Sequence, residues 1–163
     1  MTSRRNAHVE NVRGVRAELL GLLDGMDYCL DWKPEPSAWS ARQVAYHLLD
    51  SPPGGMHQVL WGMLSGDLDE FELWSDLDNM TPERLAYDLE QIREDIGEFF
   101  LAVEEALESV AAEDFDEKSV LALFRSRGTE EVLTVQVLLE RFFDRHWRGH
   151  LGQLRELRLG LGL

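Results

Sequence analysis

The amino-acid sequence predicts an all-α protein, a four-helix bundle formed by a single domain of residues 1–163. Two observations indicate this fold. Apolar residues recur at steps of three and four over several long stretches, which is the spacing of one face of a helix. Only five prolines interrupt the chain, and its 44% hydrophobic and 29% charged residues are typical of a globular domain of this length.

The first helix is expected in the N-terminal part of the chain and should end near Asp27. The loop that follows, residues 30–37, contains two prolines that extend it. The predicted inner face of this helix is formed by Val9, Val12, Val15, Leu19, Leu22 and Met26.

The second helix has a strong start signal. Ser40 can cap the amide of Gln43, and the Gln43 side chain can reach back, which is a capping box. Proline within 51–55 (Ser-Pro-Pro-Gly-Gly) removes a helical hydrogen bond and clashes with the preceding turn, so we expect a kink or break there. The helix should resume through 56–63 and end before Gly66.

The acidic stretch 67–79 is expected to be a long connection. Thr81-Pro82-Glu83 then provides an N-cap, a first-turn proline and an acid that complements the helix dipole. We therefore predict one continuous third helix, whose inner face is formed by Leu85, Leu89, Ile92, Ile96, Phe99, Val103, Ala106 and Val110.

Residues 111–128 are predicted to be mostly loop, with a short strand or a turn of helix near 120–124. Thr129 is expected to cap the fourth helix. Phe143, Trp147 and Leu151 widen its apolar arc, which indicates either a helix central to its own bundle or a self-association face. On the second interpretation we expect a homodimer with Phe143 or Trp147 near the contact. The inner stripe would be Val132, Val135, Leu139, Phe142, His146, His150, Leu154 and Leu157.

The formal net charge of −15 argues against two classes of partner. A strongly acidic surface repels phosphate backbones and anionic lipids, so we expect neither nucleic acid nor membrane as a partner. No apolar run approaches the roughly 20 residues that a membrane helix needs, and no signal peptide is recognisable, so the expected compartment is the cytoplasm. Cys29 is the single cysteine and is expected to be a buried apolar residue rather than a nucleophile.

The two C-terminal histidines are the first functional candidates. His146 and His150 are four residues apart, so a helix presents both on one face, close enough to bind one metal ion. Both fall on the apolar stripe, where an imidazole is costly unless it has a partner. The competing interpretation is a pair of hydrogen-bonded core histidines, or a pair facing solvent at the helix end. The zinc-protease motif His-Glu-x-x-His is absent.

His47 favours the metal interpretation, because it also lies on a predicted inner face. Three imidazoles without a fourth protein ligand are the stoichiometry of an open, catalytic metal site. Imidazole suits zinc, nickel, copper, cobalt or ferrous iron, and zinc or nickel is our first choice. Asp50, three residues later, could accept a hydrogen bond or act as a base, or could be a solvated surface acid. His8 and His57 are expected to be surface residues or to make local hydrogen bonds.

These motifs resemble the DinB-like (DinB/YfiT) superfamily over most of the chain. The resemblance lies in Trp39-Ser40 at a helix start, His47, and Arg145-His146-Trp147-Arg148-Gly149-His150 followed by Gln153-Leu154-Arg155. It implies an up-down-down-up four-helix bundle with a metal on the three histidines. It also implies thiol-dependent S-transferase or isomerase activity, with mycothiol, bacillithiol or glutathione as the thiol, or metal-dependent hydrolase activity. The break after His47 departs from the family pattern.

We therefore expect a metal-dependent enzyme that acts on a small molecule, of the thiol-dependent transferase or the hydrolase type. The alternative is a non-enzymatic metal-binding or stress-response bundle with a structural or vestigial site. Shared ligation also predicts topology, because His47 is near the start of the second helix and His146 and His150 are near the end of the fourth. These two helices must then be antiparallel, and the connection at 66–80, roughly 50 Å when extended, is long enough for an up-down-down-up order.

Overall fold

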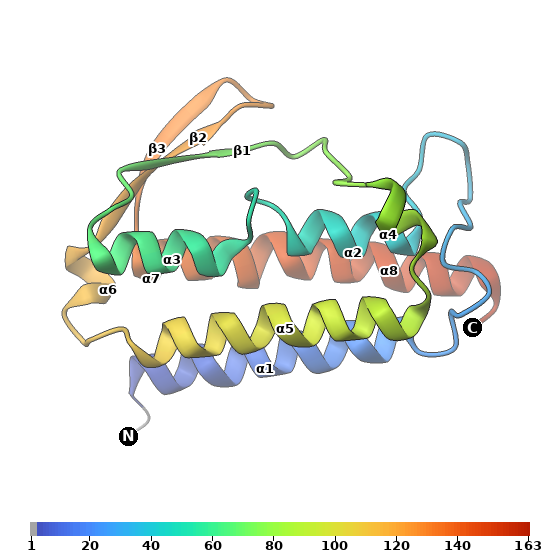
Figure 1. The fold of residues 1–163 in the computed structure, drawn as a ribbon, viewed down its shortest axis with the longest axis horizontal. Helices are drawn as coiled ribbons and strands as arrows, with labels where there is room; N and C mark the ends of the chain where they lie inside the picture. The colour runs from blue at the N-terminus through green and yellow to red at the C-terminus, as the bar shows by residue number, and fades with distance from the viewer. Residues whose placement is uncertain (1–2) are drawn as a thin grey trace.

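The computed structural model describes residues 3–163 and contains four long helical runs packed side by side (Figure 1). The chain passes along α1, returns along α2 and α3, crosses back over the bundle, runs along α5 in the direction of α3, and returns along the last helix to the C-terminus. The predicted up-down-down-up order is confirmed. The helices of these runs are α1 (Arg4–Leu23), α2 (Ala41–Leu49), α3 (Met56–Ser65), α5 (Leu89–Glu108), α7 (Val135–Leu139), a π-helical segment (Glu140–Trp147) and α8 (Arg148–Leu161).

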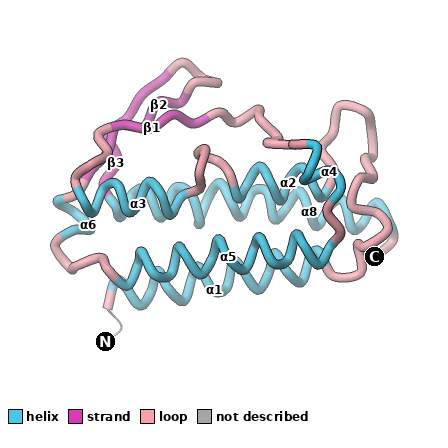
Figure 2. The backbone as a smooth tube through the Cα atoms, viewed as in Figure 1, coloured by secondary structure: helices cyan, strands magenta, loops and turns pink. Residues whose placement is uncertain are grey.

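The fold is not purely all-α, because a three-stranded sheet lies over the end of the bundle where α3 ends and α7 begins (Figures 1 and 2). The middle strand pairs in parallel with the first and antiparallel with the third. The sheet thus joins the long connection after α3 to the segment before α7. Its strands are β1 (Glu70–Leu73), β2 (Ser119–Phe124) and β3 (Thr129–Thr134), and two short helices complete the chain, α4 (Pro82–Ala86) and α6 (Asp114–Glu117).

The start predicted for the fourth helix was wrong, because Thr129 begins β3 and does not cap a helix. The cap is Thr134, whose side chain accepts a hydrogen bond from the Val137 amide. Val132, predicted to be buried, is 65% exposed on the outer strand. Residues 129–134 form a strand because they pair with β2, whose alternate residues are buried. The sequence signals of a helix start do not contain this pairing.

The predicted third helix is interrupted. Its first turn forms α4, in which Leu85 is exposed, and α5 then begins with its own cap, Asp88. The chain turns here because the guanidinium of the buried Arg42 donates hydrogen bonds to the carbonyl oxygens of Arg84 and Tyr87. These carbonyls at the end of α4 are thereby satisfied without a continuing helix.

The break at 51–55 is confirmed, and it separates α2 from α3. Gly54 and Gly55 have φ values of +87° and +90°, which L-residues with side chains rarely adopt. A Cβ on Gly55 would also lie 2.7 Å from Cε1 of the His57 ring.

Among residues 3–163, no helix is both long enough and apolar enough to cross a bilayer.

Candidate metal centre

The three predicted histidines meet between α2 and the last helix, with His47 buried and His146 and His150 half-buried. His47 is fully buried on α2, which the Ser40–Gln43 capping box starts as predicted. His146 is near the end of the π-helical segment, and His150 is in the first turn of α8. One ring nitrogen from each histidine lies within 4.8 Å of the others, and Nε2 of His47 is 3.1 Å from Nε2 of His146. Residues 99 positions apart in the sequence therefore form one site.

The π-helical segment explains the wide apolar arc of the last helix. Phe142, Phe143 and Trp147 of this segment are all buried. The Phe142 ring contacts His146 edge-on at 5.8 Å between ring centroids. Trp147 stacks on Phe99 of α5 at 5.3 Å. The helix is central to its own bundle.

This arrangement corrects the residues that we assigned to a dimer contact. Phe143 is 1% exposed and Trp147 is fully buried, so neither is available to a second chain. The apolar arc that suggested self-association is covered by other helices of the same chain.

Hydrogen bonds at Nδ1 fix His47 and His150 as Nδ1–H tautomers, which leave Nε2 free to bind a metal. Nδ1 of His47 donates to the Leu77 carbonyl oxygen at 2.6 Å, and Nδ1 of His150 donates to Oε1 of Gln153 at 2.9 Å. A carbonyl oxygen can only accept, so the proton is on Nδ1 in both rings, and each Nε2 keeps its lone pair. Such partners orient metal-binding histidines and fix their tautomers.

His146 completes the set. Its Nδ1 is buried and has no hydrogen-bond partner among the described residues, while its Nε2 faces the Nε2 lone pair of His47. Two facing lone pairs repel each other unless a proton or a cation lies between them. A divalent cation would take up the inward nitrogens of all three imidazoles at once, so the donor set fits a metal ion.

The electrostatics of the pocket favour neutral rings, which is the state that binds metal. Burial, together with the neighbouring His150 and His47, lowers the pKa of His146 to about 3. Burial likewise lowers the pKa of His47 and of His150, although the hydrogen bonds that these rings donate to Leu77 and Gln153 raise it in part. All three rings are therefore held in the neutral form, whose free nitrogens can bind a cation.

Trp39 forms one wall of the site. Its ring is 4.8 Å from that of His47 and lies nearly parallel to that of His150 at 6.2 Å. Among residues 3–163, the group of potential metal-binding side chains at this place consists of the three histidines alone. A metal held there would have no fourth ligand from a cysteine or an acid, which leaves a coordination position for water or substrate.

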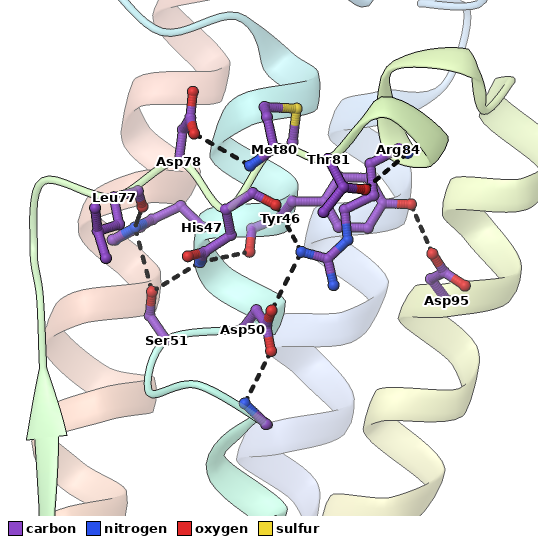
Figure 3. A network of polar contacts seen from close by, with 12 residues as sticks. Tyr46, His47, Asp50, Ser51, Leu77, Asp78, Met80, Thr81, Arg84 and Asp95 are labelled. Atoms are coloured by element: carbon purple, nitrogen blue, oxygen red, sulfur yellow. Dashed lines mark hydrogen bonds and ion pairs between the residues drawn. The ribbon is translucent and has the colours of Figure 1, made fainter.

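Asp50 does not take part in the site. Its carboxylate accepts hydrogen bonds from the Gly54 amide and from Arg84, at the end of α2 (Figure 3). Asp50 is half-buried and ion-paired with Arg84, so it is neither a base at the triad nor a freely solvated acid. A cleft of about 410 Å³ lies on this side of α2, and its lining includes Asp50 and Arg84 but none of the three histidines.

The other two histidines stay apart from the triad. His8 is buried and pairs with Gln136, 128 residues away, so the expectation of a surface or local role was wrong. His57 is half-buried against the edge of Phe99. Cys29 is buried as predicted, and burial raises the pKa of its thiol, which disfavours the nucleophilic thiolate.

Sequence reasoning missed the groups that orient the triad. Ser51 is four residues after His47, so helical spacing could have indicated its hydroxyl, 3.3 Å from Nδ1. Gln153 is one turn after His150 and could have been found in the same way. The carbonyl of Leu77 carries no sequence signal, because every residue has one.

The helix order and the three histidines together define an up-down-down-up helical bundle with a candidate metal centre. The chain is similar to the solved structure of YfiT from Bacillus subtilis, described as a probable metal-dependent hydrolase with an unusual four-helix bundle topology. The TM-score is 0.73 with 17% sequence identity, over 99% of this chain and 91% of that one. At this identity the likeness establishes the fold. No family model and no curated protein matches the sequence.

Proposed function

We propose that this protein is a divalent-metal-dependent enzyme whose metal is held by His47, His146 and His150. The observation that carries the proposal is the convergence of three neutral imidazoles, two of them fixed as Nδ1–H tautomers by dedicated acceptors. Zinc or nickel is the metal that we expect first, because imidazole nitrogen suits both. The similarity in fold to a probable metal-dependent hydrolase supports the same reaction class.

When bound, the metal supplies Lewis acidity that activates a water or a low-molecular-weight thiol for attack on a small electrophilic substrate. The protein contributes the orientation of the imidazole rings and an aromatic side chain beside them. Leu77 and Gln153 hold two rings in place, and Trp39 covers them on one side. Water as the nucleophile makes the enzyme a hydrolase, and a thiol makes it an S-transferase.

An open coordination set favours the enzyme over the alternative, a bundle with a structural metal. Structural zinc sites normally close with four protein ligands, whereas three ligands with a free position are typical of catalysis. The three ligands also come from two helices that are already packed through apolar side chains, so a metal is not needed to bring those helices together.

Metal analysis of the purified protein tests the proposal first. We expect up to one divalent transition metal ion per chain in the wild type, and its loss in His146→Ala. His57→Ala is a matched control, because it removes a half-buried histidine outside the triad. Equal metal content in the wild type and His146→Ala would refute the assignment.

An activity screen distinguishes the two reaction types. The metal-loaded protein is assayed on panels of esters, amides and alkylating electrophiles, with and without glutathione, bacillithiol or mycothiol. Turnover that depends on the thiol identifies a transferase, and turnover without a thiol identifies a hydrolase. A metal-loaded protein that is inactive in both arms would favour the non-enzymatic alternative.

A further inference from the structure

The chain between β1 and α4 passes directly over His47. Its residues 77–80, which we call the strap, include the Leu77 carbonyl that accepts the Nδ1–H of His47 at 2.6 Å. This carbonyl belongs to no helix or strand, so its place depends on what holds the strap (Figure 3).

Asn79 ties the strap to the end of α2. Its side-chain amide donates to the carbonyl oxygen of Tyr46 at 3.2 Å and to the hydroxyl of Ser51 at 3.3 Å. Both acceptors are next to His47, one beside it in sequence and one a turn later. Asn79 is also the only residue other than glycine with a positive φ (60°) among residues 3–163, a conformation that asparagine tolerates better than most residues.

Two further contacts hold the same segment. Gln43 donates to the Asp78 carboxylate at 2.7 Å, and Arg84 donates to the Asn79 carbonyl at 2.6 Å while pairing with Asp50. The strap is thus anchored at the two residues that follow Leu77. Of these anchors, the one that reaches the immediate surroundings of His47 is Asn79.

We propose that Asn79 is a positioning residue for the metal centre, which keeps His47 in the Nδ1–H tautomer by holding the Leu77 carbonyl against it. This inference rests on the proposed function, since it concerns the readiness of His47 to bind metal through Nε2. It adds a residue that contacts neither metal nor substrate but determines which nitrogen of a ligand is free.

The reason is the chemistry of the two groups that compete for Nδ1. The Leu77 oxygen can only accept, so it requires a proton on Nδ1. The Ser51 hydroxyl, 3.3 Å from the same nitrogen, can donate or accept. If the carbonyl moves away, the hydroxyl becomes the nearest partner, and it permits a proton on Nε2, where it blocks metal binding.

The test uses Asn79→Gly, which retains freedom for a positive φ and removes only the side-chain amide. Asp76→Asn is the matched control, because its carboxylate lies on the same connection but accepts from Ser126 next to the sheet. Histidine ring ¹⁵N NMR of metal-free protein reports the tautomer directly, and competition with a zinc chelator reports affinity.

We expect His47 to be the Nδ1–H tautomer in the wild type and in Asp76→Asn, and a mixture of tautomers in Asn79→Gly. Zinc affinity should fall about tenfold in Asn79→Gly, as is typical when the partner of a metal-binding histidine is lost, and should change less than about twofold in Asp76→Asn. Asn79→Asp tolerates the same backbone conformation but replaces the donor by an acceptor, so it should give the same tautomer mixture.

Wild-type tautomer and wild-type zinc affinity in Asn79→Gly would overturn the role of Asn79 and leave the metal centre standing. A tautomer change that also occurs in Asp76→Asn would overturn it too, because the effect would then be one of general loosening. A wild-type protein that binds neither zinc nor nickel would refute the proposed function itself, and this inference with it.

Discussion

Trp147 provides a sharp test of the packing. As a core residue it should stabilise the folded chain, whereas as a residue of a self-association face it should stabilise a dimer. The side chain is fully buried, stacked on Phe99 and in edge contact with Phe100. A buried aromatic side chain removes roughly 200 Å² from water, which at about 25 cal/mol per Å² gives about 5 kcal/mol. Core Trp→Ala substitutions cost about 3–5 kcal/mol. We therefore expect Trp147→Ala to lower the free energy of unfolding by about 4 kcal/mol.

Urea unfolding followed by circular dichroism measures this change. With a urea dependence of about 2 kcal/mol per M, the midpoint should fall by about 2 M. Trp147→Phe is the control, because it keeps a ring against Phe99 and removes an indole Nε1–H that has no partner among the described residues. It should cost less than half as much as the alanine variant.

Sedimentation at micromolar concentration completes the test. If Trp147 belongs to the core, the wild type and the folded variant have the same mass. The reasoning would be refuted by a Trp147→Ala variant that unfolds within about 1 kcal/mol of the wild type but has changed from dimer to monomer. That result would restore the self-association interpretation of the apolar arc.

Two further predictions concern the triad. Gln153→Ala should weaken zinc binding about tenfold, because it removes the acceptor for His150. Gln153→Glu keeps an acceptor and should retain zinc binding. Equal zinc affinities of the wild type and Gln153→Ala in chelator competition would contradict this prediction. The pKa of His146 is about 3 in the folded protein against 6.5 ordinarily, so the unfolded chain protonates first. The stability contribution of His146 is present above about pH 6.5 and is lost at about 1.4 kcal/mol per pH unit as the pH falls toward 3. Between about pH 7.5 and 5, the metal-free wild type should therefore lose about 2 kcal/mol more than His146→Gln in urea unfolding, and equal losses would count against a buried neutral ring.

Local signals were sufficient for the four long helical runs in outline and for the choice of the three candidate ligands. The Ser40–Gln43 capping box and the proline pair predicted where α2 begins and where it ends, since both act through hydrogen bonds within a few residues. The spacing of His146 and His150 predicted that they share a helical face. Adding His47 predicted the helix order as well, because three ligands of one metal must meet.

The same signals failed where a distant partner decides the local conformation. Thr129 followed by two acids has the pattern of a helix start, but pairing with β2 makes this segment a strand. The predicted third helix is divided because Arg42, more than 40 residues earlier, binds the carbonyls at its first turn.

The sequence by itself determined the helical bundle and the residue types that could hold a metal, because periodicity, capping and imidazole chemistry are local properties of the chain. Only the tertiary structure decided which nitrogen of His47 faces the centre. That choice depends on the Leu77 carbonyl, a group that every residue possesses and that acquires a role only when the strap places it 2.6 Å from His47. It also decided that Trp147 is interior, because an apolar arc is the same in sequence whether its own chain or a second chain covers it.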